Sequence, residues 1–189
     1  MVSDDSFEDR LARSGVTAEY VEMTTRQNRM NDWLDRVLPE SMLDSAPSSR
    51  DPKGFGEVSV DASIGVITVW WKGDVPDDVR TALSDPPDEM SVLIESVAYS
   101  RRQLESAVDR VIGGRRSLDA EMFAAGVHSL EADVAGGRVV VGYQDPQVGA
   151  GVEVDPVELE ARRVELEAKV TDRARVPVTL IHRGGPVAL

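Results

Sequence analysis

The sequence predicts an α+β protein made of two successive strand–strand–helix–strand units, preceded by N-terminal helices. Apolar and polar residues alternate over residues 57–61 and 66–71, and again over 125–131 and 138–143, as in the strands of two hairpins. After each hairpin, apolar residues at helical spacing are followed by a further apolar strand. Helices on one face of mostly antiparallel sheets give an α+β fold. Because the two units share little residue identity, the repeat is inferred from element order and hydrophobic pattern.

The N-terminal segment, residues 1–44, has the apolar spacing of helices. Thr17 is the expected N-cap of the longer helix, and Pro39 ends it. Its apolar face consists of Tyr20, Met23, Met30, Leu34 and Val37. We expect this face to pack on the rest of the protein; the alternative is self-association through the helix from Tyr20 to Val37. Residues 45–53 are mostly small, polar or proline, which predicts a linker.

The first α+β unit is expected over residues 54–114. Its expected elements after the first strand are a turn at 62–65, a strand at 66–71, a helix from Pro76 to about Leu83, a strand at 90–97 and a helix that Gly113 ends. Ser100 and Gln103 have the spacing of a capping box, in which the side chains of the first residue and the one three positions later bond each other's backbone N–H groups. This pattern predicts that the last helix begins just after Ser100.

The second unit is expected over residues 115–189. Its expected elements are a strand at 125–131, a turn at 133–137, a strand at 138–143, a Gly-rich loop at 147–151, a helix from Pro156 to about Thr171 and a strand at 176–182. The helix has two apolar stripes on nearly opposite faces: Val157, Ala161, Val164 and Ala168 on one, and Leu159, Leu166 and Val170 on the other. The sheet covers one stripe, and either a partner or another segment of the chain covers the other. Leu159 and Leu166 are therefore candidate partner contacts.

The composition argues against two classes of ligand. The net charge is −13, and the basic doublets at residues 101–102 and 115–116 are too sparse for a phosphate-binding surface. Nucleic acid and anionic membranes are therefore not expected partners. Cysteine is absent, no apolar run is long enough to cross a bilayer, and the first residues are acidic and polar. The compartment stays open: secreted if a signal peptide was removed, otherwise cytoplasmic.

No motif in the sequence predicts catalysis. The G-x-S-x-G, H-E-x-x-H, P-loop and EF-hand patterns are all absent. The two histidines, His128 and His182, fall in expected strands and are interpreted as structural or surface residues. We predict no catalytic, cofactor-binding or metal-binding residue. The alternative, an enzyme of small-molecule chemistry, would need a deep polar pocket around His128.

Several segments resemble a known family. They are residues 55–61 (FGEVSVD), 66–76 (VITVWWKGDVP) and 98–100 (AYS), with Leu104 following. They are similar to the propeptide domains of actinobacterial secreted serine proteases, the α-lytic protease and streptogrisin group. Gln103 stands where that pattern has glutamate. No protease follows Leu189 in this chain, so the resemblance implies either a piece of a longer precursor or a stand-alone relative.

The resemblance implies a non-catalytic protein-binding module of the folding-chaperone and inhibitor type. In such propeptides the sheet of the second subdomain pairs with a protease hairpin, and the C-terminal tail enters the active-site cleft. When this arrangement is carried over to the present sequence, the residues that would bind the partner are Val178, Thr179, Leu180, Ile181, His182, Gly184, Gly185 and Pro186. Leu159 and Leu166 are further candidates because of the apolar stripes of the helix from Pro156. The alternative is a cytoplasmic structural or adaptor protein that uses the same fold for another partner. No cofactor is expected in either case.

Overall fold

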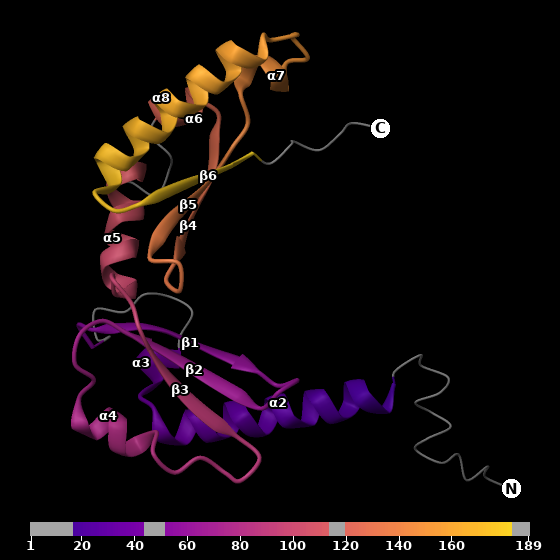
Figure 1. Cartoon of the computed structure of the whole chain (residues 1–189), viewed down its shortest axis with the longest axis vertical. Coiled ribbons are helices and arrows are strands. Elements are labelled where there is room, and N and C mark those ends of the chain that lie inside the picture. Colours follow the sequence, from indigo (N-terminus) through magenta and orange to yellow (C-terminus); the bar gives the residue numbers. More distant parts are fainter. Residues whose placement is uncertain (1–16, 44–51, 114–119, 183–189) are drawn as a thin grey trace, which may run out of the picture. The chain divides into compact units, whose positions relative to one another are not determined.

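The computed structural model describes residues 17–43, 52–113 and 120–182, and it has the α+β fold that the sequence predicts (Figure 1). The described chain divides into two compact units. The first contains residues 17–43, 58–69 and 75–95. The second contains residues 52–57, 70–74, 96–113 and 120–182.

Helix α2 (Ala18–Val37) begins and ends where capping chemistry predicts. The Thr17 hydroxyl accepts a hydrogen bond of 3.2 Å from the backbone N–H of Tyr20, which satisfies one of the free donors of the first turn. The short helix α3 (Glu40–Leu43) follows. The buried side chains here are Met30, Trp33, Leu34, Leu38 and Met42. Arg26 donates to the carbonyl oxygen of Ala62 at 3.0 Å, which joins α2 to a turn of the same unit.

The first sheet has the strand order β1 (Phe55–Asp61), β2 (Val66–Trp71), β3 (Ser91–Ser96), and α4 (Asp77–Ala82) connects the last two strands. In β2, Ile67, Val69 and Trp71 are buried while the residues between them are half-buried, as an alternating strand requires. The N–H of Ser91 donates to the carbonyl oxygen of Gly65 at 2.9 Å, and that of Val97 to Trp71 at 3.1 Å. Strand β3 therefore runs parallel to β2.

The second sheet has the order β4 (Val127–Asp133), β5 (Arg138–Tyr143), β6 (Val178–His182). Strands β4 and β5 form an antiparallel hairpin, whereas β6 is parallel to β5 with Val139 opposite Val178. The prediction of mostly antiparallel sheets is therefore corrected: each sheet is mixed. A helix between two strands carries the chain back to the end where the previous strand began, and this connection produces parallel pairing.

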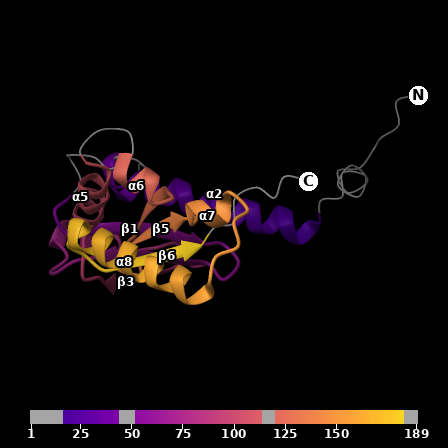
Figure 2. The same ribbon diagram turned by 90° about the horizontal axis from the view of Figure 1, so that it is seen from above.

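Within its described residues, the second unit contains four helices: α5 (Arg101–Ile112), α6 (Ala120–Ala124), α7 (Pro146–Gly149) and α8 (Pro156–Ala174). Figures 1 and 2 show α8 running alongside β6. Side chains of α5, α6, α8 and one face of the sheet share a single core that includes Leu104, Val111, Met122, Val139, Val141 and Val170. Arg110 donates to the carbonyl oxygen of Ala174 and joins α5 to the end of α8.

The predicted elements are present in the described residues, with shifts at their ends and three additional short helices. The capping box of Ser100 and Gln103 opens α5, and Gly113 ends that helix in the left-handed conformation. Helix α8 continues three residues beyond the predicted Thr171. Helix α7 replaces part of the expected loop because Asp145 caps it and Pro146 occupies its first position. Helices α3 and α6 were not predicted. Residues 45–51 of the predicted linker lie outside the described residues.

Candidate partner-binding site

Strand β6 lies at the edge of the second sheet, where β5 is its one neighbour among the described strands. The N–H of Val139 donates to the carbonyl oxygen of Pro177 at 2.9 Å. Backbone groups alternate in direction along a strand, so Thr179 and Ile181 also direct theirs toward β5. The backbone N–H and C=O groups of Val178, Leu180 and His182 point outward, away from β5. The outer edge of β6 is a row of donors and acceptors that another strand could pair with.

The two faces of the second sheet differ in how they are covered. Val178 and Leu180 are half-buried on the face that packs against α5 and α8. Ile181 is on the opposite face, and 41% of its surface is exposed. Gly142 lies beside Ile181 in the ladder, and a Cβ at this position would overlap the Ser129 side chain. Among the described residues of this unit, no helix covers that face (Figure 1).

A hollow of about 360 Å³ lies at the C-terminal end of β6. It is lined by Tyr143, Val148, Pro156, Leu159, Glu160, Arg163 and His182. The rings of Tyr143 and His182 meet edge to face, with centroids 5.7 Å apart. Burial raises the pKa of the Tyr143 hydroxyl, and the nearby Arg163 guanidinium opposes the shift. Arg163 itself is held by two carboxylates, Glu160 at 2.8 Å and Glu167 at 2.9 Å.

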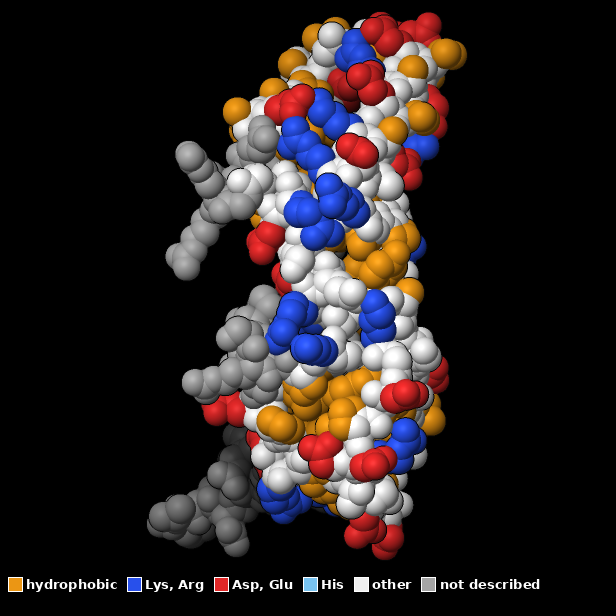
Figure 3. All heavy atoms as spheres, turned by 90° about the vertical axis from the view of Figure 1, so that its left-hand side faces the viewer, with side chains coloured by type: hydrophobic (Ala, Val, Ile, Leu, Met, Phe, Trp, Pro, Cys, Tyr) orange, Lys and Arg blue, Asp and Glu red, His pale blue; other side chains and the backbone are white. Residues whose placement is uncertain are grey.

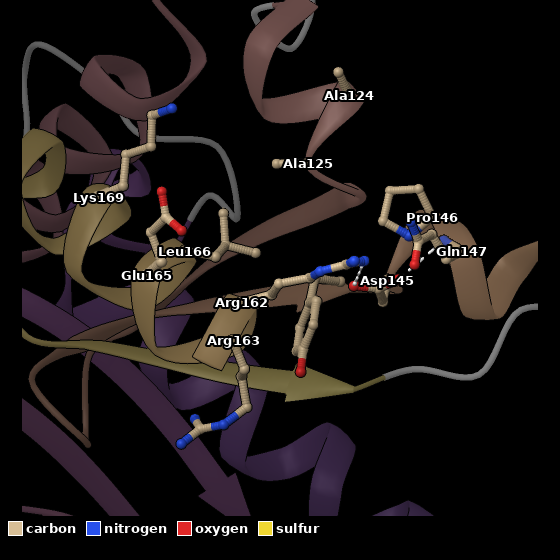
Figure 4. A pocket seen from close by; sticks show the side chains of 11 residues that line it. Ala124, Ala125, Asp145, Pro146, Gln147, Arg162, Arg163, Glu165, Leu166 and Lys169 are labelled. Atoms are coloured by element: carbon tan, nitrogen blue, oxygen red, sulfur yellow. Dashed lines mark hydrogen bonds and ion pairs between the residues drawn. The ribbon is translucent and has the colours of Figure 1, made fainter. Parts of the chain in front are cut away.

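A second hollow, also of about 360 Å³, is lined by residues of α6, α7 and α8 (Figure 4). In this view Arg162 and Asp145 face each other, while Arg163 turns away from both. Asp145 is buried and accepts the N–H of Gln147 at 2.9 Å, which caps α7. Arg162 lies 3.6 Å from Asp145 and 2.6 Å from Glu158. The principal charged side chains here are paired with one another. These contacts hold α7 in place, which is a sufficient structural role for the residues that line this hollow.

The structure brings together some of the residues singled out in the sequence. His182 and Leu159 line the same hollow at the end of β6. Leu166 is 7% exposed and belongs to the core, so its side chain is not available to a partner. Gly184, Gly185 and Pro186 lie outside the described residues.

Tyr143 and Arg163 also line this hollow, although the sequence did not place them among the candidate partner contacts. The alternation of Val139, Val141 and Tyr143 places the tyrosine on the inner face of β5. That signal predicts its burial but not the approach of His182 from a strand about forty residues later in the chain. Across the described residues, His, Asp and Glu side chains form no group of three that could hold a metal ion.

Comparisons with known proteins add no family assignment. No protein-family model matches the chain, and no curated protein matches it. None of the helices in the described ranges is long and apolar enough to cross a bilayer. The geometry of the second sheet and the resemblance of the sequence are therefore the observations that bear on function.

Proposed function

We propose that this protein is a non-catalytic module that binds an extended segment of a partner protein along the outer edge of β6. The observation that carries the proposal is the outward direction of the backbone groups of Val178, Leu180 and His182 at the sheet edge. An added strand gains main-chain hydrogen bonds, and a pocket beside the edge selects among its side chains. The hollow lined by Tyr143, Leu159 and His182 is suited to be such a pocket for a side chain of the added strand.

The resemblance to propeptides suggests that the partner is a secreted serine protease. A module that binds only the folded partner stabilises it by mass action, which is how a binding domain can assist folding. The same complex inhibits the protease when it blocks substrate access. The C-terminal end of β6 leads into the segment that the resemblance assigns to the active-site cleft.

The test is inhibition of a streptogrisin-type or α-lytic-type protease by the purified chain. His182→Pro removes one outward N–H from the edge, whereas His182→Ala removes the ring and keeps the N–H. One net hydrogen bond contributes about 0.5–1.5 kcal/mol, so His182→Pro should weaken inhibition roughly two- to tenfold relative to His182→Ala. Equal inhibition by the two variants would contradict binding at this edge. Failure of the wild-type chain both to inhibit the protease and to assist its refolding would contradict the protease partner.

A second candidate function is that of an adaptor that self-associates through α2. The specific observation is that Tyr20 is 56% and Met23 is 39% exposed, whereas Met30 and Leu34 on the same apolar face are buried. Light scattering would separate the two candidates. Oligomers that dissociate in a Tyr20→Ser/Met23→Ser variant favour the adaptor, and a monomeric wild-type chain excludes self-association through α2.

A further inference from the structure

Helix α8 carries an apolar stripe that no described part of the second unit covers. Val157 is 77% exposed and Val164 is 52% exposed. Ala161, which lies between them, and Ala168, which follows them, are also exposed. The opposite stripe faces the core, where Leu166 and Val170 are buried. Over the second unit, at the top of Figure 3, hydrophobic side chains lie among acidic and basic ones.

The stripe has the spacing by which one helix packs against another. Val157, Ala161, Val164, Ala168 and Thr171 follow one another in steps of four, three, four and three residues. This is the repeat of the a and d positions of paired helices. The stripe is about 21 Å long at 1.5 Å per residue, which matches two heptads of a partner helix.

The residues that flank the stripe are all acidic. At 100° per residue, Glu158, Glu165 and Asp172 lie along one side of it, and Glu160 and Glu167 lie along the other. These are the e and g positions, which decide the choice of partner in paired helices. Glu158 is paired with Arg162, and Glu160 and Glu167 with Arg163, through contacts within α8. Glu165 and Asp172 form no ion pair with any residue in the described ranges.

The basic residues of α8 do not neutralise the acidic residues that flank the apolar stripe. Arg162 and Lys169 lie beyond the acidic flank, closer to the face that packs on the unit. Arg162 is directed toward Asp145, and Lys169 pairs with Glu121 of α6. A helix lying on the stripe would therefore meet carboxylates along both of its sides.

We propose that this face of α8 binds an amphipathic helix of another protein, whose apolar seam is flanked by lysine or arginine. A second copy of the chain fits poorly, because parallel or antiparallel pairing of two such helices places carboxylates opposite carboxylates. The net charge of −13 adds to this repulsion. The proposal does not depend on partner binding at the edge of β6, which uses a different element.

The test uses two synthetic three-heptad peptides that are identical except for lysine or glutamate at every e and g position. Binding to the full chain is measured by fluorescence anisotropy at low and high salt. The lysine peptide should bind at least about tenfold more tightly than the glutamate peptide, and salt should reduce the difference because exposed charges are screened.

Matched variants distinguish the stripe from general attraction to an acidic surface. Val157→Gln/Val164→Gln should weaken lysine-peptide binding at least about tenfold, while Val152→Gln changes an equally exposed valine outside the helix and should have no effect. Glu165→Lys/Asp172→Lys should shift the preference toward the glutamate peptide. Unchanged binding of the lysine peptide by Val157→Gln/Val164→Gln overturns the proposal. So does binding of neither peptide by the wild type, or self-association that these valine substitutions abolish.

Discussion

The ring of His182 stands at 87° to the ring of Tyr143, and the two residues are directly paired in the parallel ladder of β5 and β6. Tyr143 is 5% exposed and belongs to the core, whereas His182 is exposed at the last position of the edge strand. Edge-to-face packing is a favoured arrangement of aromatic rings. The contact therefore fixes the end of β6 to the interior beside the hollow.

His182→Ala should lower the free energy of unfolding by about 0.5–1 kcal/mol, because the ring contact with Tyr143 is lost. His128→Ala is the control, since His128 is an exposed histidine of β4 without a ring contact among the described residues. Urea denaturation measures both variants. Equal losses would show that the Tyr143–His182 contact contributes nothing specific.

Gln103→Glu should stabilise the protein by about 0.5–1 kcal/mol. The Gln103 Oε1 atom accepts the N–H of Ser100 at 3.1 Å and the Lys72 ammonium at 2.7 Å. A carboxylate strengthens both hydrogen bonds and places the first anion in a first turn that has none. Gln103→Met keeps the side-chain length but removes the acceptor, and it should cost about 1 kcal/mol. A destabilising Gln103→Glu in thermal unfolding would contradict this account of the helix start.

Two glycines with positive φ should respond differently to alanine. Gly126 has a φ of 85°, and a Cβ there would overlap the carbonyl oxygen of Gln144. Gly151 has a φ of 75° with open space around the Cβ position. Gly151→Ala should cost only the strain of the left-handed backbone, about 1–2 kcal/mol. Gly126→Ala adds a backbone clash and should cost about 3 kcal/mol or more. Similar costs in chemical denaturation would refute the clash.

The carboxyl of Glu105 in α5 should make stability depend on pH. Burial raises the pKa of Glu105, Asp109 one turn later raises it further, and Arg101 opposes the shift. A raised pKa means that the folded state disfavours the carboxylate more than the unfolded chain does. This destabilisation is complete above the folded-state pKa and disappears below the ordinary glutamate pKa, where both states are protonated.

Glu105→Gln should therefore increase the free energy of unfolding at neutral pH, and the gain should shrink to zero as the pH falls below the ordinary glutamate pKa. Urea titrations at a series of pH values measure the gain. Glu153→Gln, at an exposed glutamate, is the control. A gain that persists at low pH would show that the effect does not come from the charge of Glu105.

Local signals in the sequence were sufficient to predict most of the fold. Alternation defined β2 and β5 to the residue, and Thr17, Ser100 and Asp155 mark helix starts because their side chains can bond free N–H groups. The direction of β6 could not be predicted in this way, because alternation is the same in parallel and antiparallel strands. It depends on a connection through α8.

The candidate site was less predictable because it is assembled from several elements. The hollow beside β6 combines Tyr143 of β5, Leu159 of α8 and His182 of β6, and no local pattern relates them. The sequence also left open which stripe of α8 faces inward, because both are apolar. The stripe with the bulkier Leu166 fills the core, and the stripe with two alanines remains exposed.

The most direct test of the proposed function is amide hydrogen exchange of β6, measured by NMR in the free chain and in the complex with a streptogrisin-type protease. In the free chain, the N–H groups of Thr179 and Ile181 should be protected by β5, and those of Leu180 and His182 should exchange quickly. In the complex, Leu180 and His182 should become protected. Protection of Leu180 and His182 already in the free chain, or no gain at these two amides in the complex, would contradict strand addition at this edge.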